Sequence, residues 1–312
     1  MKTAFLYAGQ GSQHKGMGKD LYNDYPEFKE IFDGVNTDFD LKEICFEDPE
    51  GELSQTKYTQ PCMVAFACGV TKILKNKGIK PDIMAGLSLG EYSALQASGV
   101  WSASEAVELA SFRGNAMTRS SEGVDSGMTA VMGLTRDELQ SCVNEASKLG
   151  VVSICNDNCP GQLVLGGEKA AVAAAAELAK NRGAKRCVPL NVSGPFHTSF
   201  MSKAGDELSD YFKNIDFEEE KIPVVFNLIG RERNVDETVK DLLIGQVQNG
   251  VKMTQSINYM LDKGVRRFIE IGPGRALTGF AKRCAKEKNI EDIECFSVET
   301  STDVENLSEA IA

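Results

Sequence analysis

A serine flanked by glycines gives the strongest chemical signal in this sequence. Gly86-Leu87-Ser88-Leu89-Gly90 has the spacing G-x-S-x-G, and it lies between a short apolar run at residues 81–85 and a helical pattern at residues 91–97. A serine on such a strand-to-helix turn can expose its hydroxyl as a nucleophile, while the first N–H groups of the helix can stabilise an oxyanion. The same spacing also occurs in ordinary loops with a helix-capping serine, so the flanking strand and helix are what favour a nucleophilic Ser88.

A serine nucleophile needs a base, and the chain has only two histidines, His14 and His197. His197 lies in a Gly-Pro loop directly after a predicted subdomain, where we expect a cleft. His14 follows a glycine-rich turn, in a context typical of an exposed loop. We therefore expect His197 to be the base, with His14 as the alternative. No acidic residue stands out as a third member, so we expect a dyad whose orienting group the pattern leaves unassigned; a backbone carbonyl could serve.

Arg113 is expected to lie inside the protein. It falls on the apolar side of a predicted helix at residues 104–119, three or four residues from its apolar neighbours. A buried guanidinium needs a partner, and a carboxylate is its natural one. Two partners remain open, namely an internal Asp or Glu and the carboxylate of a substrate.

Strand-like and helix-like segments alternate along the chain, which predicts an α/β architecture of packed layers. Residues 126–193 have the order strand-helix-strand-strand-helix-strand, which predicts a ferredoxin-like unit inserted into a larger α/β domain. Further on, a helix is expected at residues 251–261. The acidic tail after Glu299 has little to bury, so we expect it to be loosely held.

Two short glycine turns carry weaker signals. Gly9-Gln10-Gly11-Ser12-Gln13 follows the first predicted strand, and Gly272-Pro273-Gly274 follows a later one. The first lacks the lysine of a phosphate loop and the spacing of a dinucleotide fingerprint. Taken alone, both are interpreted as strand-to-helix turns.

Composition argues against several classes of function. The chain has 312 residues and a formal charge of −11, whereas nucleic-acid binding needs clustered Lys and Arg. Its nine cysteines show no metal-ligand spacing, so we expect reduced thiols, no disulfide framework and no metal site. No segment approaches the roughly 20 apolar residues of a membrane span, and the N-terminal apolar stretch is too short for a signal peptide. We therefore expect a soluble, cytoplasmic protein that binds neither membrane nor nucleic acid.

Five short motifs follow one another along the chain, namely Gly9-Gln10-Gly11-Ser12-Gln13, Gly86-Leu87-Ser88-Leu89-Gly90-Glu91-Tyr92, Phe112-Arg113-Gly114, Pro195-Phe196-His197 and Glu270-Ile271-Gly272-Pro273-Gly274. In their order and spacing they together resemble the malonyl-CoA:acyl carrier protein transacylases of fatty acid synthesis. The resemblance runs from the N-terminus to about Lys286. It implies an α/β-hydrolase-like core formed by residues 1–125 and 194–312, with the ferredoxin-like subdomain at residues 126–193.

The resemblance also implies a ping-pong mechanism. Ser88, deprotonated by His197, would attack the thioester of malonyl-CoA, and the backbone N–H groups of Leu89 and Gln10 would hold the oxyanion. Arg113 would grip the free carboxylate of the malonyl-enzyme. The phosphopantetheine thiol of an acyl carrier protein would then take the acyl group. Coenzyme A enters as a substrate thioester, so no cofactor or metal is expected.

Three positions refine the resemblance. Phe196, directly before the histidine, is the residue expected of malonyl-selective members. Lys252 stands where relatives often carry glutamine or arginine, and the backbone carbonyl at that position is the family's usual partner for the catalytic histidine. Ala8 stands where many members have proline.

Other functions remain open. A serine hydrolase would use the same dyad with water as acceptor, and a trans-acting polyketide-type acyltransferase would differ in its carrier and its acyl group. A non-catalytic carrier-binding scaffold would have no need of Ser88, His197 and Arg113 together. We expect a monomer. Because acyl carrier proteins are acidic, a basic surface is also expected. Its candidates are Lys185, Arg186, Arg266, Arg267, Lys282 and Arg283.

Overall fold

The computed structural model describes residues 1–311, and the chain divides into two compact units. The first unit contains Met1–Asn115, Asp216–Phe226 and the chain from Asn258 onward. The second contains Ala116–Ile215 and Asn227–Ile257, so residues 126–193 lie within it together with segments on either side. Each unit combines one sheet with helices, which confirms the predicted α/β class.

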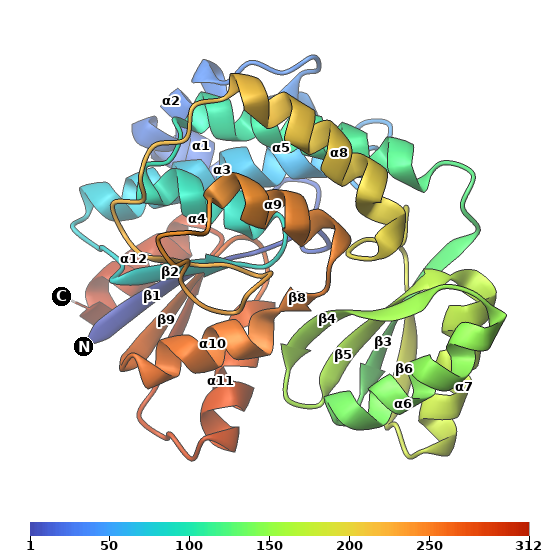
Figure 1. Cartoon of the computed structure of the whole chain (residues 1–312). Coiled ribbons are helices and arrows are strands. Elements are labelled where there is room, and N and C mark those ends of the chain that lie inside the picture. The colour runs from blue at the N-terminus through green and yellow to red at the C-terminus, as the bar shows by residue number, and fades with distance from the viewer. Residues whose placement is uncertain (312) are drawn as a thin grey trace. The chain divides into compact units, whose positions relative to one another are not determined.

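The first unit is built on a parallel sheet with the strand order β10-β9-β1-β2-β7. Its central strand β1 is buried from Thr3 to its end at Tyr7. Both faces of a parallel sheet are covered, because crossover helices connect its strands. Figure 1 shows α3 and α4 on one side of β1 and β2, and α11 on the other. The strands are β1 (Lys2–Tyr7), β2 (Ile83–Gly86), β7 (Val224–Val225), β9 (Val265–Ile271) and β10 (Glu294–Val298), and these helices are α3 (Thr56–Asn76), α4 (Gly90–Ser98) and α11 (Ala276–Glu287).

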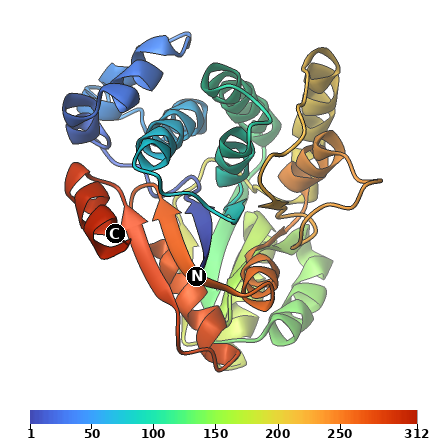
Figure 2. The same ribbon diagram turned by 90° about the vertical axis from the view of Figure 1, so that its left-hand side faces the viewer.

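The acidic tail is ordered, and the prediction that it is loosely held is wrong. Residues after Glu299 form helix α12 (Ser301–Ile311), which buries Val304 and Leu307 and lies beside β10 (Figure 2). Val304 and Leu307 are three residues apart and therefore lie on the same face of the helix. The first unit also contains α1 (Lys19–Asp24), α2 (Pro26–Gly34) and a π-helical turn at Glu43–Glu47, while α5 spans Ala103–Ser121.

The second unit has a sheet with the strand order β6-β3-β5-β4-β8. The first four strands are antiparallel neighbours, and β8 pairs with β4 in parallel. Helices α6 and α7 pack on one face of this sheet, around a core that includes Leu139, Leu165 and Val172. The elements are β3 (Ser126–Met132), α6 (Arg136–Ala146), β4 (Val152–Cys159), β5 (Gln162–Glu168), α7 (Lys169–Asn181), β6 (Arg186–Leu190) and β8 (Val251–Lys252).

Residues 251–261 differ from the single helix predicted there. Val251 and Lys252 form strand β8, and helix α10 (Met253–Asp262) starts only afterwards. The apolar spacing of this segment hides the strand, because two residues are too few to show a period of two. Helices α8 (Ser202–Tyr211) and α9 (Val239–Gln248) complete the second unit, with short 3₁₀ turns at Ser147–Leu149, Ser199–Met201 and Phe212–Asn214. None of the helices within residues 1–311 combines the length and the apolar character needed to span a bilayer.

Candidate active site

Three glycine-rich turns leave the same edge of the first unit's sheet. Tyr7, the last residue of β1, pairs with Gly86 at the end of β2 and with Ile271 at the end of β9. The turns at these strand ends belong to the glycine motifs at residues 9–13, 86–90 and 270–274. The carboxyl ends of neighbouring parallel strands are where α/β proteins place their ligands. Three of the five sequence motifs therefore meet at the edge where a site is expected.

Ser88 lies on a sharp turn between β2 and α4. Its φ of 53° is in the left-handed region, which costs a non-glycine residue free energy and occurs often at functional sites. The two glycines of the motif make the turn possible by close packing. A Cβ on Gly86 would lie 1.9 Å from the carbonyl carbon of Gly90, and a Cβ on Gly90 would lie 2.1 Å from the carbonyl oxygen of Tyr7.

Two backbone amides next to the turn have no acceptor among the described residues. Leu89 stands at the N-cap of α4, where the first N–H groups of a helix have no intrahelical partner. Gln10 lies in the turn after β1, and its backbone N–H likewise meets no acceptor within residues 1–311. The two turns interlock, because the Leu87 N–H donates to the Tyr7 carbonyl at 3.0 Å. Both amides can thus stabilise an anionic oxygen.

Arg113, on α5, has its side chain beside Ser88. Its Nη2 donates to Ser88 Oγ at 3.1 Å and its Nη1 donates to Gln60 Oε1 at 2.9 Å. The guanidinium also lies over the ring of Tyr92, 5.3 Å from the ring centre. Arg113 is only 1% exposed, which confirms that it lies inside the protein. The structure therefore brings Ser88 and Arg113 together within one unit.

The partner of Arg113 was left open by the sequence. Burial lowers the pKa of its guanidinium, and Tyr92 and the carboxylate of Glu91 act in the opposite direction. An internal carboxylate therefore lies close enough for its charge to be felt. The direct hydrogen bonds of the two Nη atoms described above nevertheless go to neutral oxygens of Gln60 and Ser88.

A chain of side-chain amides fixes Arg113, and sequence reasoning missed it. A guanidinium can only donate, so Gln60 must turn its oxygen to Arg113 and its NH₂ to Gln10 Oε1, at 3.4 Å. Gln10 in turn donates from Nε2 to Thr56 Oγ1 at 2.9 Å. Gln60 and Thr56 are both buried at the start of α3. Proline is typical of a helix start, so Pro61 hides the beginning of α3, where both residues lie.

His197 belongs to the second unit and has a φ of 60°, again in the left-handed region. Its Nδ1 lies 2.9 Å from the carbonyl oxygen of Gln246. A carbonyl only accepts, so Nδ1 carries the proton and Nε2 is the basic nitrogen of the neutral ring. Gln246 lies in the last turn of α9, where helix carbonyls have no intrahelical donor. Phe196, directly before His197, is buried.

The orienting carbonyl was expected at Lys252, and the structure corrects this to Gln246. The carbonyl of Lys252 accepts from Ser256 Oγ at 2.8 Å, and its N–H donates to the carbonyl of Asn227 at 2.9 Å. The backbone of Lys252 is thus used within the second unit, in β8 and at the start of α10. Its side chain is exposed.

His14 has a different environment. Its Nδ1 lies 2.9 Å from the Lys15 carbonyl, and its Nε2 lies 2.5 Å from Glu299 Oε1. Both ring nitrogens face acceptors, which favours the doubly protonated ring, and the hydrogen bond to Glu299 raises the pKa of His14. A histidine with both nitrogens engaged as donors has none left to accept a proton. The geometry therefore argues against His14 as a base.

The third turn has a structural role that its sequence did not reveal. Glu270, at the end of β9, is 1% exposed and accepts from the backbone N–H groups of Leu277 and Thr278 at 3.0 and 2.8 Å. These amides are at the start of α11, where a carboxylate is favoured. Burial raises the pKa of Glu270, against the effect of these hydrogen bonds. The Glu270–Gly274 motif thus ties α11 to the sheet.

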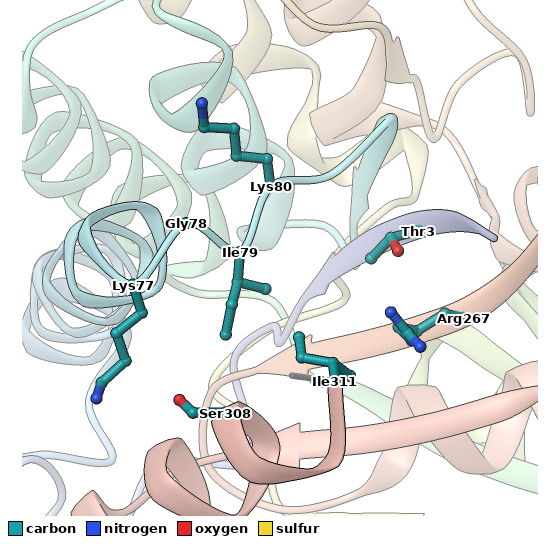
Figure 3. Close-up of a pocket in the computed structure, with 8 residues that line it drawn as sticks. All are labelled: Thr3, Lys77, Gly78, Ile79, Lys80, Arg267, Ser308 and Ile311. Carbon is teal, nitrogen blue, oxygen red and sulfur yellow. The ribbon is translucent and has the colours of Figure 1, made fainter.

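A cavity of about 310 Å³ lies elsewhere in the first unit (Figure 3). It contains none of the predicted site residues, and it includes Thr3, at the opposite end of β1 from the three turns. The ammonium groups of Lys77 and Lys80 point away from the other labelled residues in Figure 3, and Arg267 pairs with Glu294 at 2.7 Å. We assign this cavity no part in the chemistry. Within residues 1–311, no three His, Cys, Asp or Glu side chains gather as metal ligands.

The fold and the site define an α/β protein with a serine on a glycine-bounded turn between strand and helix, an arrangement used for acyl transfer. Residues 4–304 match the model of the acyl transferase domain family, and the chain belongs to this family. The protein is therefore an acyltransferase.

Relatives and solved structures agree with this assignment. The malonyl CoA-acyl carrier protein transacylase of Staphylococcus aureus (strain MRSA252) is 37% identical over 311 residues, 99% of each chain. The crystal structure of the enzyme of the same name from Clostridium perfringens is 36% identical, with a TM-score of 0.93 over 100% of this chain and 97% of that one. A malonyl-transacylase solved in complex with the holo acyl carrier protein of a type II polyketide synthase is 33% identical, with a TM-score of 0.92 over 99% of this chain and 100% of that one.

Gly90→Ala should lower the free energy of unfolding by about 2 kcal/mol or more, because its methyl group would overlap the Tyr7 carbonyl. Gly279→Ala is the matched control. Gly279 lies within α11, and a Cβ there meets nothing within 4 Å, so alanine should stabilise the protein by about 0.5–1 kcal/mol. Urea unfolding followed by circular dichroism measures both. Equal effects of the two substitutions would contradict the packing argument.

His14→Asn should leave the reaction of Ser88 with a fluorophosphonate within about threefold of wild type, because a ring that donates from both nitrogens is not a base. The variant should instead lose a pH-dependent part of its stability. The pKa of His14 is raised in the folded state, so its contribution to stability is complete below the ordinary histidine pKa of 6.5 and is lost as the pH rises through the raised pKa. Unfolding midpoints at several pH values test this. A large loss of Ser88 reactivity would instead make His14 a candidate base.

Proposed function

We propose that this acyltransferase moves the malonyl group of malonyl-CoA to the phosphopantetheine thiol of an acyl carrier protein, through a malonyl ester on Ser88. The names of its relatives and solved neighbours support both substrates. The trans-acting polyketide-type enzyme and the acyl hydrolase remain as alternatives, and no observation favours either one.

The observation that carries the proposal is the hydrogen bond between Arg113 and Ser88, 3.1 Å long. It places a buried cation beside Ser88, the proposed nucleophile, and a buried guanidinium favours an anionic ligand. A malonyl ester ends in a free carboxylate one methylene from the ester carbonyl, so it can bring an anion to this guanidinium. An acetyl ester or a longer alkyl ester has no such group. Arg113 thereby selects a dicarboxylic acyl group.

In the first half-reaction, Ser88 Oγ attacks the thioester carbon while His197 Nε2 takes its proton. The negative charge develops on the carbonyl oxygen, and the amides of Leu89 and Gln10 stabilise it. The carbon–sulfur bond then breaks, and coenzyme A leaves with the proton held by His197. The hydrogen bond from Nδ1 to the Gln246 carbonyl keeps the ring in the tautomer that this step requires.

The second half-reaction runs the same chemistry in reverse. His197 takes the proton of the pantetheine thiol, the thiolate attacks the malonyl ester, and Ser88 regains its proton as the ester bond breaks. Proton and acyl group balance without a redox partner, so the proposal needs no metal or resident cofactor. Phe196, next to His197, is proposed to favour malonyl over branched acyl groups.

The proposed architecture is an α/β-hydrolase-like core of residues 1–125 and 194–312 with a ferredoxin-like subdomain at residues 126–193. The order β6-β3-β5-β4 with antiparallel neighbours and the sequence β3-α6-β4-β5-α7-β6 support the second part. With coenzyme A thioesters and a carrier protein as substrates, the proposed location is the cytoplasm.

Incubation with malonyl-CoA alone should add one malonyl group to the intact mass of the protein, and holo acyl carrier protein should then remove it. Ser88→Ala should abolish the mass increase, because no other hydroxyl occupies the turn. Chelation of metal ions should change nothing. Loading followed by release to water without transfer would make the protein a hydrolase, and the absence of any loading would refute the proposal.

Arg113→Met should reduce malonyl loading by about 100-fold or more, because the carboxylate would enter a buried site without its partner. Loading from acetyl-CoA should be equal to that of wild type or faster. The ratio of the two initial loading rates, measured by mass spectrometry, tests selectivity rather than folding. An equal loss with both acyl groups would mean that Arg113 supports the turn and not the acyl carboxylate.

A further inference from the structure

An exposed apolar strip runs along one edge of the second unit's sheet. Seven large hydrophobic side chains are exposed within residues 1–311, and three of them alternate in one short segment. They are Val188 (42% exposed), Leu190 (37%) and Val192 (37%). Clustered exposed apolar side chains mark interaction surfaces, whereas isolated ones need no explanation.

All three side chains follow the period of two of a strand. Val188 and Leu190 lie opposite Ala130 and Met128 of β3. The intervening Cys187 lies opposite Val131, which packs into the core beneath α6 and α7. Val188 and Leu190 therefore lie on the face of the sheet away from these helices. Val192 follows at the same spacing just after the strand.

Two cations stand at the start of this strip. Lys185 and Arg186 are exposed, and neither has an ion-pair partner among the described residues. Of the other candidates for a basic surface, Arg266 and Arg267 pair with Asp292 and Glu294. In a chain with a net charge of −11, two adjacent cations beside exposed apolar side chains form a locally basic surface.

We propose that this surface of β6, namely Val188, Leu190 and Val192 with Lys185 and Arg186, is where the acyl carrier protein docks; the inference rests on the proposed carrier-dependent transfer. An apolar centre with a charged rim is the usual composition of a transient protein interface. An acidic carrier complements the two cations. The position of this surface also fits a docking role, because it lies close to His197 along the chain. Val192 is five residues before His197, and five residues of extended chain span at most about 17 Å. A flexible prosthetic arm can cover that distance.

The edge of β6 is suited to side-chain contacts rather than to strand addition. Pro189 is the fourth of the five residues of β6 and has no backbone N–H to offer a partner strand. Proline on an edge strand is a common protection against edge-to-edge pairing. A second copy of this chain is the other possible occupant, and oligomeric state distinguishes it.

The test uses two double variants. One carries Val188→Ser and Leu190→Ser, and the other carries Lys185→Glu and Arg186→Glu. The matched control is Leu149→Ser with Val151→Ser, which removes two exposed apolar side chains of the same unit outside the strip. Three rates are measured for each protein: malonyl loading from malonyl-CoA, transfer to bacterial holo acyl carrier protein, and transfer to free pantetheine. The first two variants should raise KM for the carrier about tenfold, with loading and transfer to pantetheine within about twofold of wild type. The control should resemble wild type.

An unchanged KM for the carrier, or an equal loss with carrier and pantetheine, would overturn the docking surface. The docking surface would also be overturned if the wild type sediments as a dimer and the variant with Val188→Ser and Leu190→Ser sediments as a monomer. Failure of wild type to load malonyl would refute the proposed function separately. Binding of fluorescent holo carrier by anisotropy then decides the docking question, with about tenfold weaker binding expected for both variants.

Discussion

The candidate site depends on the close approach of two backbone turns at the carboxyl ends of β1 and β2. Leu87 donates to the Tyr7 carbonyl, and that same oxygen would lie 2.1 Å from any Cβ on Gly90. A Cβ on Gly9 would lie 2.5 Å from the Leu87 carbonyl oxygen. Only glycine permits these distances, and they let Ser88 adopt its left-handed φ. The strain at Ser88 is stabilised by the packing on either side, so Ser88 and both candidate oxyanion amides are held in place by backbone contacts.

Side chains add direction to this backbone frame. Because Arg113 can only donate, it determines which end of Gln60 faces it, and Gln60 then determines the orientation of Gln10. Thr56 completes the chain by accepting from Gln10. Hydrogen bonds thereby connect Arg113 to Gln10 within the first unit. Arg113 would bind an acyl carboxylate, and the backbone amide of Gln10 would bind the oxyanion. A substrate carboxylate bound at Arg113 would compete with Ser88 Oγ for Nη2, which would release the serine hydroxyl from this hydrogen bond before acyl transfer.

The sequence predicted the parts of the site that depend on local pattern. A strand, a glycine-bounded serine and a helix are visible over a dozen residues, and an arginine in an apolar stripe is visible over two helical turns. Contacts between distant segments left no such trace. The carbonyl beside His197 belongs to Gln246, in the last turn of α9, where carbonyls have no N–H partner within the helix. No spacing in the sequence indicates this contact. Gln60 was hidden because Pro61 resembles a helix start, although the helix begins at Thr56.

The two histidines show why environment decides function where residue type does not. His14 and His197 both follow glycine-containing turns, and each has one ring nitrogen beside a backbone carbonyl. The second nitrogen of His14 meets a carboxylate, which stabilises the imidazolium and raises the pKa of the ring. A base must be neutral before it acts, so this contact disfavours His14 for that purpose. At His197, a backbone carbonyl accepts from Nδ1 and so favours the tautomer in which Nε2 is the basic nitrogen. Because this carbonyl is uncharged, it does not hold the ring in its charged form as a carboxylate would.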